Sequence, residues 1–388
     1  MPFEHINLRL ANCDWNSAVN KTVDTLLKGG VAVVPTETVY GLAARLYDTH
    51  AINKLIELKG RNPNSPFALA FPNTDAPNAD AIEDFGIAMS PLAKRLARRS
   101  LPGPVSLVLD VPVGSSPFWK LPAEVQQAVS LHSAVSCRVP DHPLLLPVLG
   151  ELNEPIVLTS ANKSGCGENT NIEQIIADLG EGINLLIDEG PITEPKPSTI
   201  VKIVGNDYTI LREGLLKPDT IKRLSALMIL FVCAGNTCRS PMAEHLCETL
   251  LAERLHCSVE ELDHRGIVVM SAGLTATEGR PATAKTIEVL REFGIESDTH
   301  RTLQLNEMHV RFADYIFVMT RLHRERILSH WPQVDSRLYV LRSDGGDIID
   351  PIGSSQNVYR ACAEQIQTAL SLRTPFVLEG HFAAGGVC

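Results

Sequence analysis

A cysteine and an arginine with the spacing needed for phosphate chemistry lie near the middle of the chain. Cys233 and Arg239 belong to the segment 233–240 (CAGNTCRS), which follows the apolar run 228–232. The apolar run predicts a buried strand, and Pro241 suits the first position of a helix. Loop N–H groups and the positive end of that helix favour an anion and the thiolate form of Cys233. The segment predicts attack of sulfur on phosphorus, with Arg239 donating two hydrogen bonds to phosphoryl oxygens.

Three other residues of this loop have predicted supporting roles. Ser240 is expected to donate a hydrogen bond to the Cys233 thiolate, and Asn236 is expected to hold the shape of the loop. Cys238 has two interpretations: a resolving thiol that traps oxidised Cys233 as a reversible disulfide, or a small buried side chain. Its spacing from Cys233, without a histidine or a second cysteine pair, does not indicate zinc.

The loop and the segments after it resemble the low-molecular-weight protein phosphatase family over residues 228–372. The matching segments occur in the family's order: 271–274 (SAGL), 279–281 (GRP), 294–301 (GIESDTHR) and 313–320 (ADYIFVMT). The resemblance implies a smaller doubly wound parallel-sheet domain that needs no cofactor and hydrolyses a phosphorylated protein.

The family also needs a general acid on a distant loop, and Asp350 in 350–353 (DPIG) fits that position. Such a carboxyl group would protonate the leaving group and then activate the water that hydrolyses the phosphocysteine. Asp344 and Asp347 are alternatives, and an Asp-Pro pair can also simply open a turn. The helix expected over 357–372 favours Asp350.

Thr237 bears on the choice of substrate. Tyrosine-directed members of the family usually carry a bulky aliphatic residue at this position, and a hydroxyl group resembles the protein arginine phosphatases. A polar side chain suits a guanidinium, whereas an aliphatic one suits an aromatic ring. Phosphotyrosine and phosphoarginine both remain open as substrates.

The first half of the chain alternates apolar runs with amphipathic stretches and predicts a mixed α/β domain. The expected helices are 50–59 and 171–179, and the expected strands are 31–34, 67–70, 105–109, 155–158, 183–187, 199–201 and 208–211. Four cations beside predicted elements could converge on one concave face: Lys59, Arg61, Arg138 and Arg212. No G-x-x-x-x-G-K-[ST] motif occurs in this half, so a triphosphate would depend on such cations.

Seven segments of this half, taken in order, resemble the YrdC-type threonylcarbamoyl-AMP synthases over residues 8–217. They are 36–42 (TETVYGL), 59–61 (KGR), 102–108 (PGPVSLV), 138–143 (RVPDHP), 159–165 (TSANKSG), 197–201 (PSTIV) and 211–214 (LREG). The resemblance implies a mixed twisted sheet and the synthesis of threonylcarbamoyl-AMP and pyrophosphate from L-threonine, bicarbonate and ATP. That product is a precursor for tRNA modification, so a downstream tRNA-modifying threonylcarbamoyl transferase is an expected partner.

The resemblance also assigns residues to the substrates. The ATP-binding residues would be Lys59, Arg61, Ser65, Arg138, Asn162 and Arg212, and the threonine-binding residues would be Thr36, Tyr40, Ser160 and Ser198. A magnesium ion is expected with ATP, and no residue is predicted to ligate a metal directly. Because the reaction needs only positioning and charge neutralisation, no protein nucleophile is expected.

Two departures from the family pattern affect these expectations. Many members carry a histidine where this chain has Ala70 and Phe71, so part of the threonine contact is expected to be lost or replaced. The usual proline after Arg212 is Glu213, and a negative charge beside Arg212 is expected to weaken or alter ATP contact.

Composition excludes several classes of protein. The 388 residues carry a net charge of −10, so direct nucleic-acid binding is predicted to be weak or absent. The basic residues of 94–99 are interpreted as a solvated helix face. No run has the length of a membrane span, and the first residues lack the pattern of a signal peptide. Nine cysteines without regular spacing predict reduced thiols and a cytoplasmic location.

The sequence thus predicts a two-domain α/β protein with a synthase domain over 8–217, a linker over 218–227, a phosphatase domain over 228–372 and a loose tail over 373–388. The main hypothesis is a bifunctional enzyme. The alternative is a phosphatase regulated by a catalytically silent module that binds a nucleotide or RNA. Carbamoyl transfer to another acceptor ranks last, because the Cys-x-x-Cys pairs of carbamoylating maturation factors do not occur.

Overall fold

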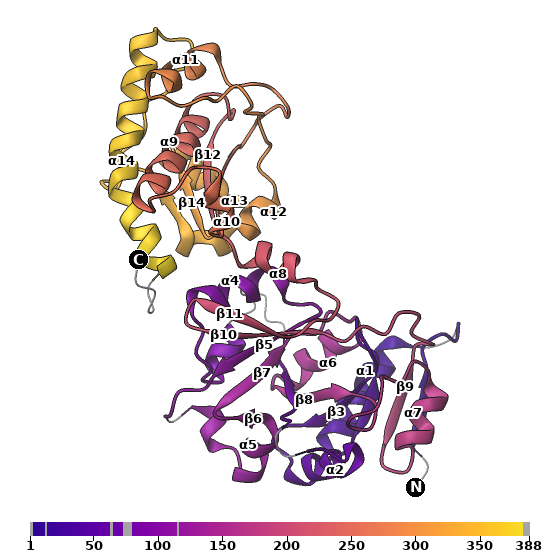
Figure 1. Ribbon diagram of the computed structural model, residues 1–388. Helices are drawn as coiled ribbons and strands as arrows, with labels where there is room; N and C mark the ends of the chain where they lie inside the picture. Colours follow the sequence, from indigo (N-terminus) through magenta and orange to yellow (C-terminus); the bar gives the residue numbers. More distant parts are fainter. Residues whose placement is uncertain (1–2, 12–13, 63–64, 73–79, 115, 383–388) are drawn as a thin grey trace. The chain divides into compact units, whose positions relative to one another are not determined.

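The computed structural model describes residues 3–11, 14–62, 65–72, 80–114 and 116–382. The chain divides into two compact units, Met1–Ile221 and Lys222–Cys388 (Figure 1). Among the described residues, no helix is both long enough and apolar enough to cross a membrane.

The first unit contains a mixed sheet. Its strands are β1 (Glu4–Asn7), β2 (Ala32–Val34), β3 (Gly41–Arg45), β4 (Ala68–Ala70), β5 (Val105–Asp110), β6 (Ser130–Leu131), β7 (Ala134–Arg138), β8 (Ile156–Ser160), β9 (Leu185–Asp188), β10 (Thr199–Val204) and β11 (Asp207–Arg212). In the described residues their order is β1-β9-β2-β3-β8-β4-β7-β5-β10-β11, with β6 paired to β7. Parallel pairs such as β4–β7 alternate with antiparallel pairs such as β3–β8, which confirms the predicted mixed sheet.

Helices pack around this sheet. They are α1 (Trp15–Leu27), α2 (Thr49–Lys59), α3 (Asp80–Asp84), α4 (Pro91–Ser100), α5 (Ala123–Val129), α6 (Leu145–Leu152) and α7 (Ile172–Leu179), with the 3-10 helix η1 (Pro117–Lys120). The division between the two units falls within α8 (Pro218–Ser225). α2 begins where the Asp48 side chain accepts a hydrogen bond from the Ala51 N–H group, and it ends at Gly60, which has φ +56°. These two caps put Lys59 at the last position of the helix.

The second unit has a parallel sheet. Its strands are β12 (Leu227–Cys233), β13 (Ile267–Gly273), β14 (Tyr315–Val318) and β15 (Leu338–Val340), and its helices are α9 (Arg239–Arg254), α10 (Glu261–His264), α11 (Ala284–Glu292), α12 (Glu307–Phe312), α13 (Arg321–His330), η2 (Pro332–Arg337) and α14 (Gln356–Phe382). The order of the strands in the described residues is β13-β12-β14-β15, and all the pairs are parallel.

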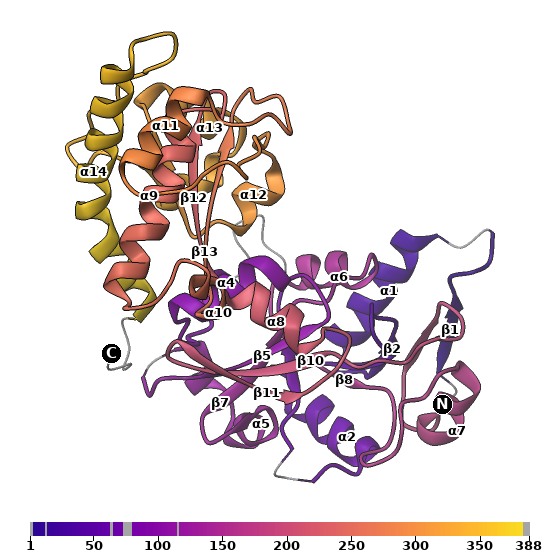
Figure 2. The same cartoon turned by 45° about the horizontal axis from the view of Figure 1, so that its top comes forward.

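Alternate residues of β12 belong to two hydrophobic cores, because side chains of a strand point to opposite faces. Ile229, Phe231 and Cys233 belong to the core with α9 and α14, whereas Leu230 and Val232 belong to the core with α12 and α13. α9 and α14 lie side by side in both views (Figures 1 and 2). Helices therefore cover both faces of the sheet, which confirms the doubly wound fold.

Two predictions about the helices are wrong. α14 continues to Phe382, and Thr374 and Val377 are buried in it, so the chain is not a loose tail from residue 373 onward. The basic residues of α4 do not all lie on a solvated face, because Lys94 is exposed and Arg98 partly exposed, whereas the side chains of Arg95 and Arg99 are buried. The expected helix stopped at residue 372, and in neither case could the partner that buries the helix be predicted from the sequence.

Candidate active sites

The loop between β12 and α9 surrounds the sulfur of Cys233. Cys233 ends β12, and its side chain is buried. The Asn236 N–H group donates to Cys233 Sγ over 3.2 Å, and Ser240 Oγ lies 3.0 Å from the same sulfur. Both groups can donate a hydrogen bond to the sulfur that would attack phosphorus, and so they hold it in place.

Asn236 holds the loop in an unusual conformation. Its φ is +54°, in the left-handed region that few side chains other than asparagine tolerate. Its Nδ2 donates to Ser240 Oγ and to Ser271 Oγ, and its Oδ1 accepts from the Leu303 N–H group. His300 Nε2 lies 3.0 Å from its backbone oxygen. Four bonds from three segments therefore fix the turn that aims the Asn236 N–H group at the sulfur.

Gly273 lets β13 pass directly beneath this loop. A Cβ atom at Gly273 would lie 2.7 Å from the Ala234 oxygen and 2.9 Å from the Asn236 nitrogen. Both are backbone atoms of the loop, so a larger residue would push the loop away from its present position.

Arg239 and Asp350 form an ion pair at the mouth of the loop. Arg239 Nη2 donates to Asp350 Oδ2 over 2.6 Å, and the arginine is buried whereas 48% of the Asp350 side chain is exposed. The two other candidates for the general acid have different partners. Asp344 accepts from Arg342, and Asp347 accepts from the Arg321 N–H group. Of these three carboxylates, Asp350 is the one that contacts Arg239.

Cys238 is a free thiol beside several hydroxyl groups. Its Sγ lies 3.5 Å from Tyr359 OH and 3.6 Å from the hydroxyl oxygens of Thr237 and Thr283. Burial, with the bond to Cys238, raises the pKa of Tyr359 to about 12. The role of Cys238 as a resolving thiol stays a prediction.

His323 lies near the same ion pair and was missed by the sequence analysis. It belongs to α13 and is buried, and among the described residues its Nδ1 has no hydrogen-bond partner. Burial, followed by the charge of Arg239, lowers its pKa to about 4. His323 is therefore neutral at physiological pH, and no sequence motif marks it.

The first unit contains a cavity of about 500 Å³. Seven predicted substrate-binding residues line it: Thr36, Arg61, Ser65, Arg138, Ser160, Ser198 and Arg212. They come from loops and from the ends of β7, β8 and β11, so the sheet brings together residues that are far apart in the sequence.

The three arginines of this cavity are held by neighbouring groups. Arg61 donates to Thr159 Oγ1 and to the Pro66 oxygen, and its guanidinium lies 4.4 Å from the centre of the Phe67 ring. Arg212 donates to the Ser198 oxygen over 2.9 Å. Partial burial lowers the pKa of Arg61 to about 10.

Arg138 forms a largely buried ion pair with Glu37. Its Nη2 donates to Glu37 Oε1 over 2.8 Å and to Thr38 Oγ1 over 2.9 Å. Within the described residues, Arg138 Nε and Glu37 Oε2 are buried without a hydrogen-bond partner. The guanidinium therefore keeps donor capacity next to the cavity.

Lys59 does not line the cavity but lies directly behind it. It is buried, and its Nζ donates to the Ser160 oxygen over 2.8 Å and to Asn162 Oδ1 over 2.9 Å. Burial and then the charge of Arg61 lower the pKa of Lys59 to about 8. Asn162 is buried too and donates to the Cys166 oxygen. These two predicted ATP-binding residues thus contact the wall of the cavity from behind.

Tyr40 and Thr36 differ in their relation to the cavity. Thr36 Oγ1 accepts from the Thr38 and Val39 N–H groups and so closes the turn after β2. Tyr40 is buried outside the lining, where its OH donates to the Gly190 oxygen and accepts from the Glu189 N–H group. Tyr40 therefore ties the β2–β3 turn to the segment after β9 and does not itself face the cavity.

The residues that depart from the family pattern, Ala70, Phe71 and Glu213, are not among the residues that line the cavity. Ala70 and Phe71 are buried in the core of the unit. Glu213 forms an ion pair with Lys217 over 2.6 Å, whereas the Arg212 guanidinium donates to Ser198. The expected effect of Glu213 on ATP contact stays a prediction, and the ion pair with Lys217 partly offsets the charge of Glu213.

Two acidic residues that the sequence did not point to also line the cavity. They are Asp110 at the end of β5 and Glu168 in the loop after β8. Glu168 lies close enough to Lys59 and Arg212 for its charge to raise the pKa of both, against the larger effect of burial. Neither residue belongs to the segments that carried the resemblance, so the sequence offered no signal for them.

Comparisons with known proteins match the two halves of the chain to two different families. Residues 24–214 match the Sua5/yciO/yrdC family model, described as "Telomere recombination", and residues 228–373 match the model of low molecular weight phosphotyrosine protein phosphatases. A protein-arginine-phosphatase of Geobacillus stearothermophilus is 38% identical over 146 residues, which are 37% of this chain and 90% of that protein. A putative threonylcarbamoyl-AMP synthase of Mycobacterium tuberculosis (strain ATCC 25618 / H37Rv) is 31% identical over 199 residues, which are 51% of this chain and 85% of that protein.

Solved structures give similar matches. The YwlE arginine phosphatase from Geobacillus stearothermophilus covers 42% of this chain and 99% of its own, at 33% identity and a TM-score of 0.37. Together with the sequence matches over most of each relative's length, the two family models confirm both resemblances. The chain therefore belongs to the Sua5/yciO/yrdC family in its first half and to the low molecular weight phosphotyrosine protein phosphatase family in its second.

Proposed function

We propose that this chain is a bifunctional enzyme. The first unit makes L-threonylcarbamoyl-AMP and pyrophosphate from L-threonine, bicarbonate and ATP, and the second is a cysteine-dependent protein phosphatase. The observation that carries the proposal for the second unit is the sulfur of Cys233 held by Asn236 and Ser240, with Arg239 and Asp350 beside it. For the first unit it is the cavity lined by three arginines and several hydroxyl groups.

The geometry of the second unit supports a two-step reaction. Cys233 Sγ attacks phosphorus, the bond to the leaving group breaks, and the Asp350 carboxyl group gives its proton to the leaving atom. Water then attacks the phosphocysteine, Asp350 takes a proton from it, and phosphate leaves. A bound phosphoryl group would replace Asp350 as the partner of Arg239, and the exposure of Asp350 lets it reach the leaving group.

For the substrate we propose phosphoarginine in proteins. Thr237 is partly exposed on the loop, and its backbone oxygen accepts from the Thr283 N–H group, so the side chain is held in place. The protein-arginine-phosphatase of Geobacillus stearothermophilus is also among the relatives of this unit. Replacing Thr237 by isoleucine should lower kcat/KM for a phosphoarginine peptide relative to a phosphotyrosine peptide by about tenfold. An unchanged ratio would contradict the role of Thr237.

A trapping experiment tests the phosphatase mechanism. The Asp350→Asn variant should still transfer phosphate to Cys233 from an aryl phosphate with a good leaving group, and then hydrolyse it about 100-fold more slowly. Mass spectrometry of the quenched protein should detect phosphate on Cys233. Asp347→Asn is the matched control and should keep full turnover. Full turnover in Asp350→Asn would contradict the assignment of the acid.

In the first unit, the residues act by position and charge. The threonine amine and CO2 from bicarbonate form a carbamate, whose oxygen attacks the α-phosphorus while pyrophosphate leaves. Arg61, Arg138 and Arg212 would neutralise the triphosphate in a cavity of about 500 Å³. A Mg²⁺ ion carried by the triphosphate would add further neutralisation of the phosphates.

Product analysis tests this activity. The full chain incubated with ATP, bicarbonate and L-threonine should yield threonylcarbamoyl-AMP by mass spectrometry, and omission of any one substrate should abolish it. Because the product is a reactive mixed anhydride, we propose that a downstream transferase consumes it to modify tRNA. AMP formation without the adduct would contradict the proposal.

We also propose a cytoplasmic location and the domain bounds 8–217 and 228–382, the second extended from the expected 372 because α14 runs to Phe382. The location is supported by the thiols: the cysteines of the described residues, Cys137, Cys166, Cys233, Cys238, Cys247, Cys257 and Cys362, are free. Fractionation of the native host, followed by immunoblotting, tests the location. Recovery of the chain in an extracellular fraction would contradict it.

A further inference from the structure

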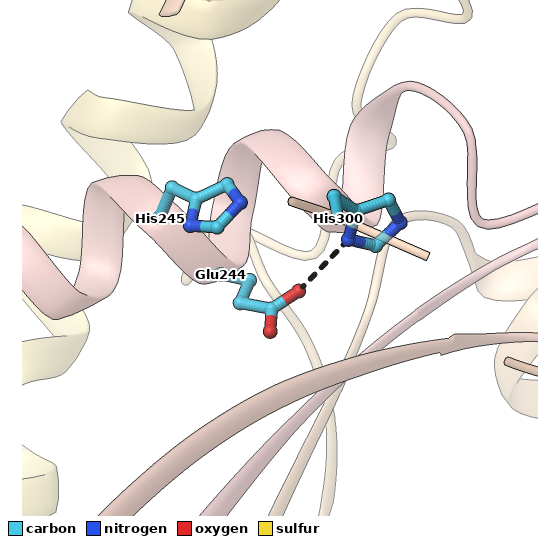
Figure 3. Close-up of side chains that lie close together, drawn as sticks. All are labelled: Glu244, His245 and His300. Atoms are coloured by element: carbon cyan, nitrogen blue, oxygen red, sulfur yellow. Dashed lines mark ion pairs between the residues drawn. The ribbon is translucent and has the colours of Figure 1, made fainter. Parts of the chain in front are cut away.

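Three side chains with atoms that can bind a metal lie together beside the phosphatase loop. Glu244 and His245 are neighbours on α9, and His300 belongs to the segment between α11 and α12. One candidate ligand atom from each residue lies within 4.8 Å of the other two. Figure 3 shows the Glu244 carboxylate between the two imidazole rings, with one oxygen directed at His300.

The hydrogen bond to the loop fixes the tautomer of His300. Its Nε2 lies 3.0 Å from the backbone oxygen of Asn236, and a carbonyl oxygen can only accept, so Nε2 carries a proton. A neutral imidazole with its proton on Nε2 leaves Nδ1 as the acceptor nitrogen. Nδ1 then has an unshared electron pair, and it faces Glu244 Oε2 at 3.7 Å.

His245 is oriented in a similar way from the other side. Its Nδ1 lies 3.0 Å from Glu248 Oε2, one turn further along α9, and so donates to that carboxylate. Its Nε2 is buried and, within the described residues, has no hydrogen-bond partner. A buried polar atom without a partner costs free energy, and so calls for an explanation.

Glu244 completes the set. Its Oε2 accepts a hydrogen bond from Ser271 Oγ over 2.6 Å, and 17% of its side chain is exposed. Two imidazole nitrogens and one carboxylate oxygen thus converge, and each residue is oriented by a further group: Glu248, the Asn236 carbonyl and Ser271. Histidine ligands of protein metal sites are typically oriented in this way.

We propose that Glu244, His245 and His300 bind one divalent transition-metal ion of the zinc class. Two histidines and a glutamate match the preference of Zn²⁺ for imidazole and carboxylate ligands, and three protein ligands leave the fourth tetrahedral position for water. Mg²⁺ and Ca²⁺ prefer sets of oxygen atoms, so the two imidazoles disfavour them.

The site is connected to the phosphatase loop by two residues. His300 is bonded to the Asn236 carbonyl, and Ser271 is bonded to both Glu244 and Asn236. An ion bound to His300 Nδ1 polarises the ring and strengthens its hydrogen bond from Nε2. The metal therefore clamps α9 to the His300 segment and stabilises the turn at Asn236, without touching the substrate.

Cobalt titration of the full chain tests the proposal. The Cys233→Ser background prevents metal from binding the nucleophilic sulfur. One equivalent of Co²⁺ should produce the visible d–d bands of a tetrahedral site, without the near-ultraviolet charge-transfer band of thiolate ligands. Zn²⁺ should displace Co²⁺. Absence of stoichiometric binding, or a spectrum with a thiolate band, would overturn the proposal.

Two variants of the same background make the test specific. His245→Gln should weaken Co²⁺ and Zn²⁺ affinity by at least about tenfold. His264→Gln, an exposed histidine of α10, is the matched control and should bind as the background does. Zn²⁺ should raise the Tm of the background and of His264→Gln but not of His245→Gln, a readout that also reports folding. Equal affinities in the two variants would overturn the proposal.

Discussion

The two candidate active sites of this chain are built in opposite ways. In the second unit, one loop of eight residues supplies the nucleophile, the hydrogen bonds to it and the arginine, and only Asp350 comes from elsewhere. In the first unit, residues from Thr36 to Arg212 meet around one cavity, and no short segment contains the site. Chemistry that depends on one nucleophile can be concentrated in a loop, whereas chemistry that depends on charge and position is distributed over a sheet.

The largest expected effect concerns the nucleophile. Cys233→Ser should lower phosphatase turnover on the order of 10⁴-fold or more, because a serine hydroxyl is a far weaker nucleophile than a thiolate. The same variant should leave threonine-dependent pyrophosphate release unchanged. Cys257→Ser, a partly exposed cysteine, is the matched control and should keep both activities. A loss of both activities in Cys233→Ser would show that the two sites are coupled.

The next effect concerns the support of the loop. Gly273→Ala should lower phosphatase kcat by about 100-fold, because the new methyl group would press on the Ala234 oxygen and the Asn236 nitrogen. Phosphatase kinetics measured beside circular dichroism would separate loop displacement from unfolding. Gly150→Ala, where the added methyl group would meet open space, should change neither. Unaltered kinetics in Gly273→Ala would mean that the loop tolerates displacement.

A single cation of the first unit should matter less than the single sulfur of the second. Arg212→Ala should raise the KM for ATP by about 10- to 100-fold, the range for one charged hydrogen bond, and leave measurable turnover. Pyrophosphate release at varied ATP concentrations checks this prediction. Arg223→Ala, on an exposed position of α8, is the control. Complete loss of turnover in Arg212→Ala would indicate that this site also depends on one essential residue.

The smallest effect is a pH dependence. Burial lowers the pKa of Lys59 to about 8, so the free enzyme loses this charge as the pH rises through that value. Anionic ATP favours the charged form. ATP affinity should therefore fall above pH 8 by up to roughly tenfold per pH unit, and binding should take up a proton. Calorimetry in buffers of different ionisation enthalpy measures that proton, and the uptake should disappear in Lys59→Met. An ATP affinity that is constant from pH 7 to 9 would contradict this account.

The contrast between local and distributed structure also explains which elements could be predicted from the sequence. The strands β2, β5, β8, β9 and β12 are apolar runs, and the structure confirms them. The central strands β3 and β7 were not predicted, because Gly-Leu-Ala-Ala-Arg and Ala-Val-Ser-Cys-Arg contain few β-branched residues and no clear alternation. Tertiary pairing, not local preference, makes these two segments strands.

In the two candidate active sites, too, local features could be predicted and contacts between distant segments could not. The loop of Cys233 could be predicted from eight adjacent residues, since its geometry is local. Glu168 and His323 could not, because each is brought to its site by packing of distant elements. Lys59 was placed correctly at the end of its helix, but its position behind the cavity wall depends on Ser160 and Asn162. Contacts between distant segments are what sequence patterns do not contain.

The central claim is that one chain carries two independent active sites. The most direct measurement is pyrophosphate release from ATP and bicarbonate by the purified full chain, with and without L-threonine, followed beside hydrolysis of an aryl phosphate by the same preparation. The account predicts that pyrophosphate release requires threonine and persists in Cys233→Ser, which has lost the hydrolysis. Aryl phosphate hydrolysis without any threonine-dependent pyrophosphate release would contradict it, and would indicate a phosphatase with a catalytically silent first unit.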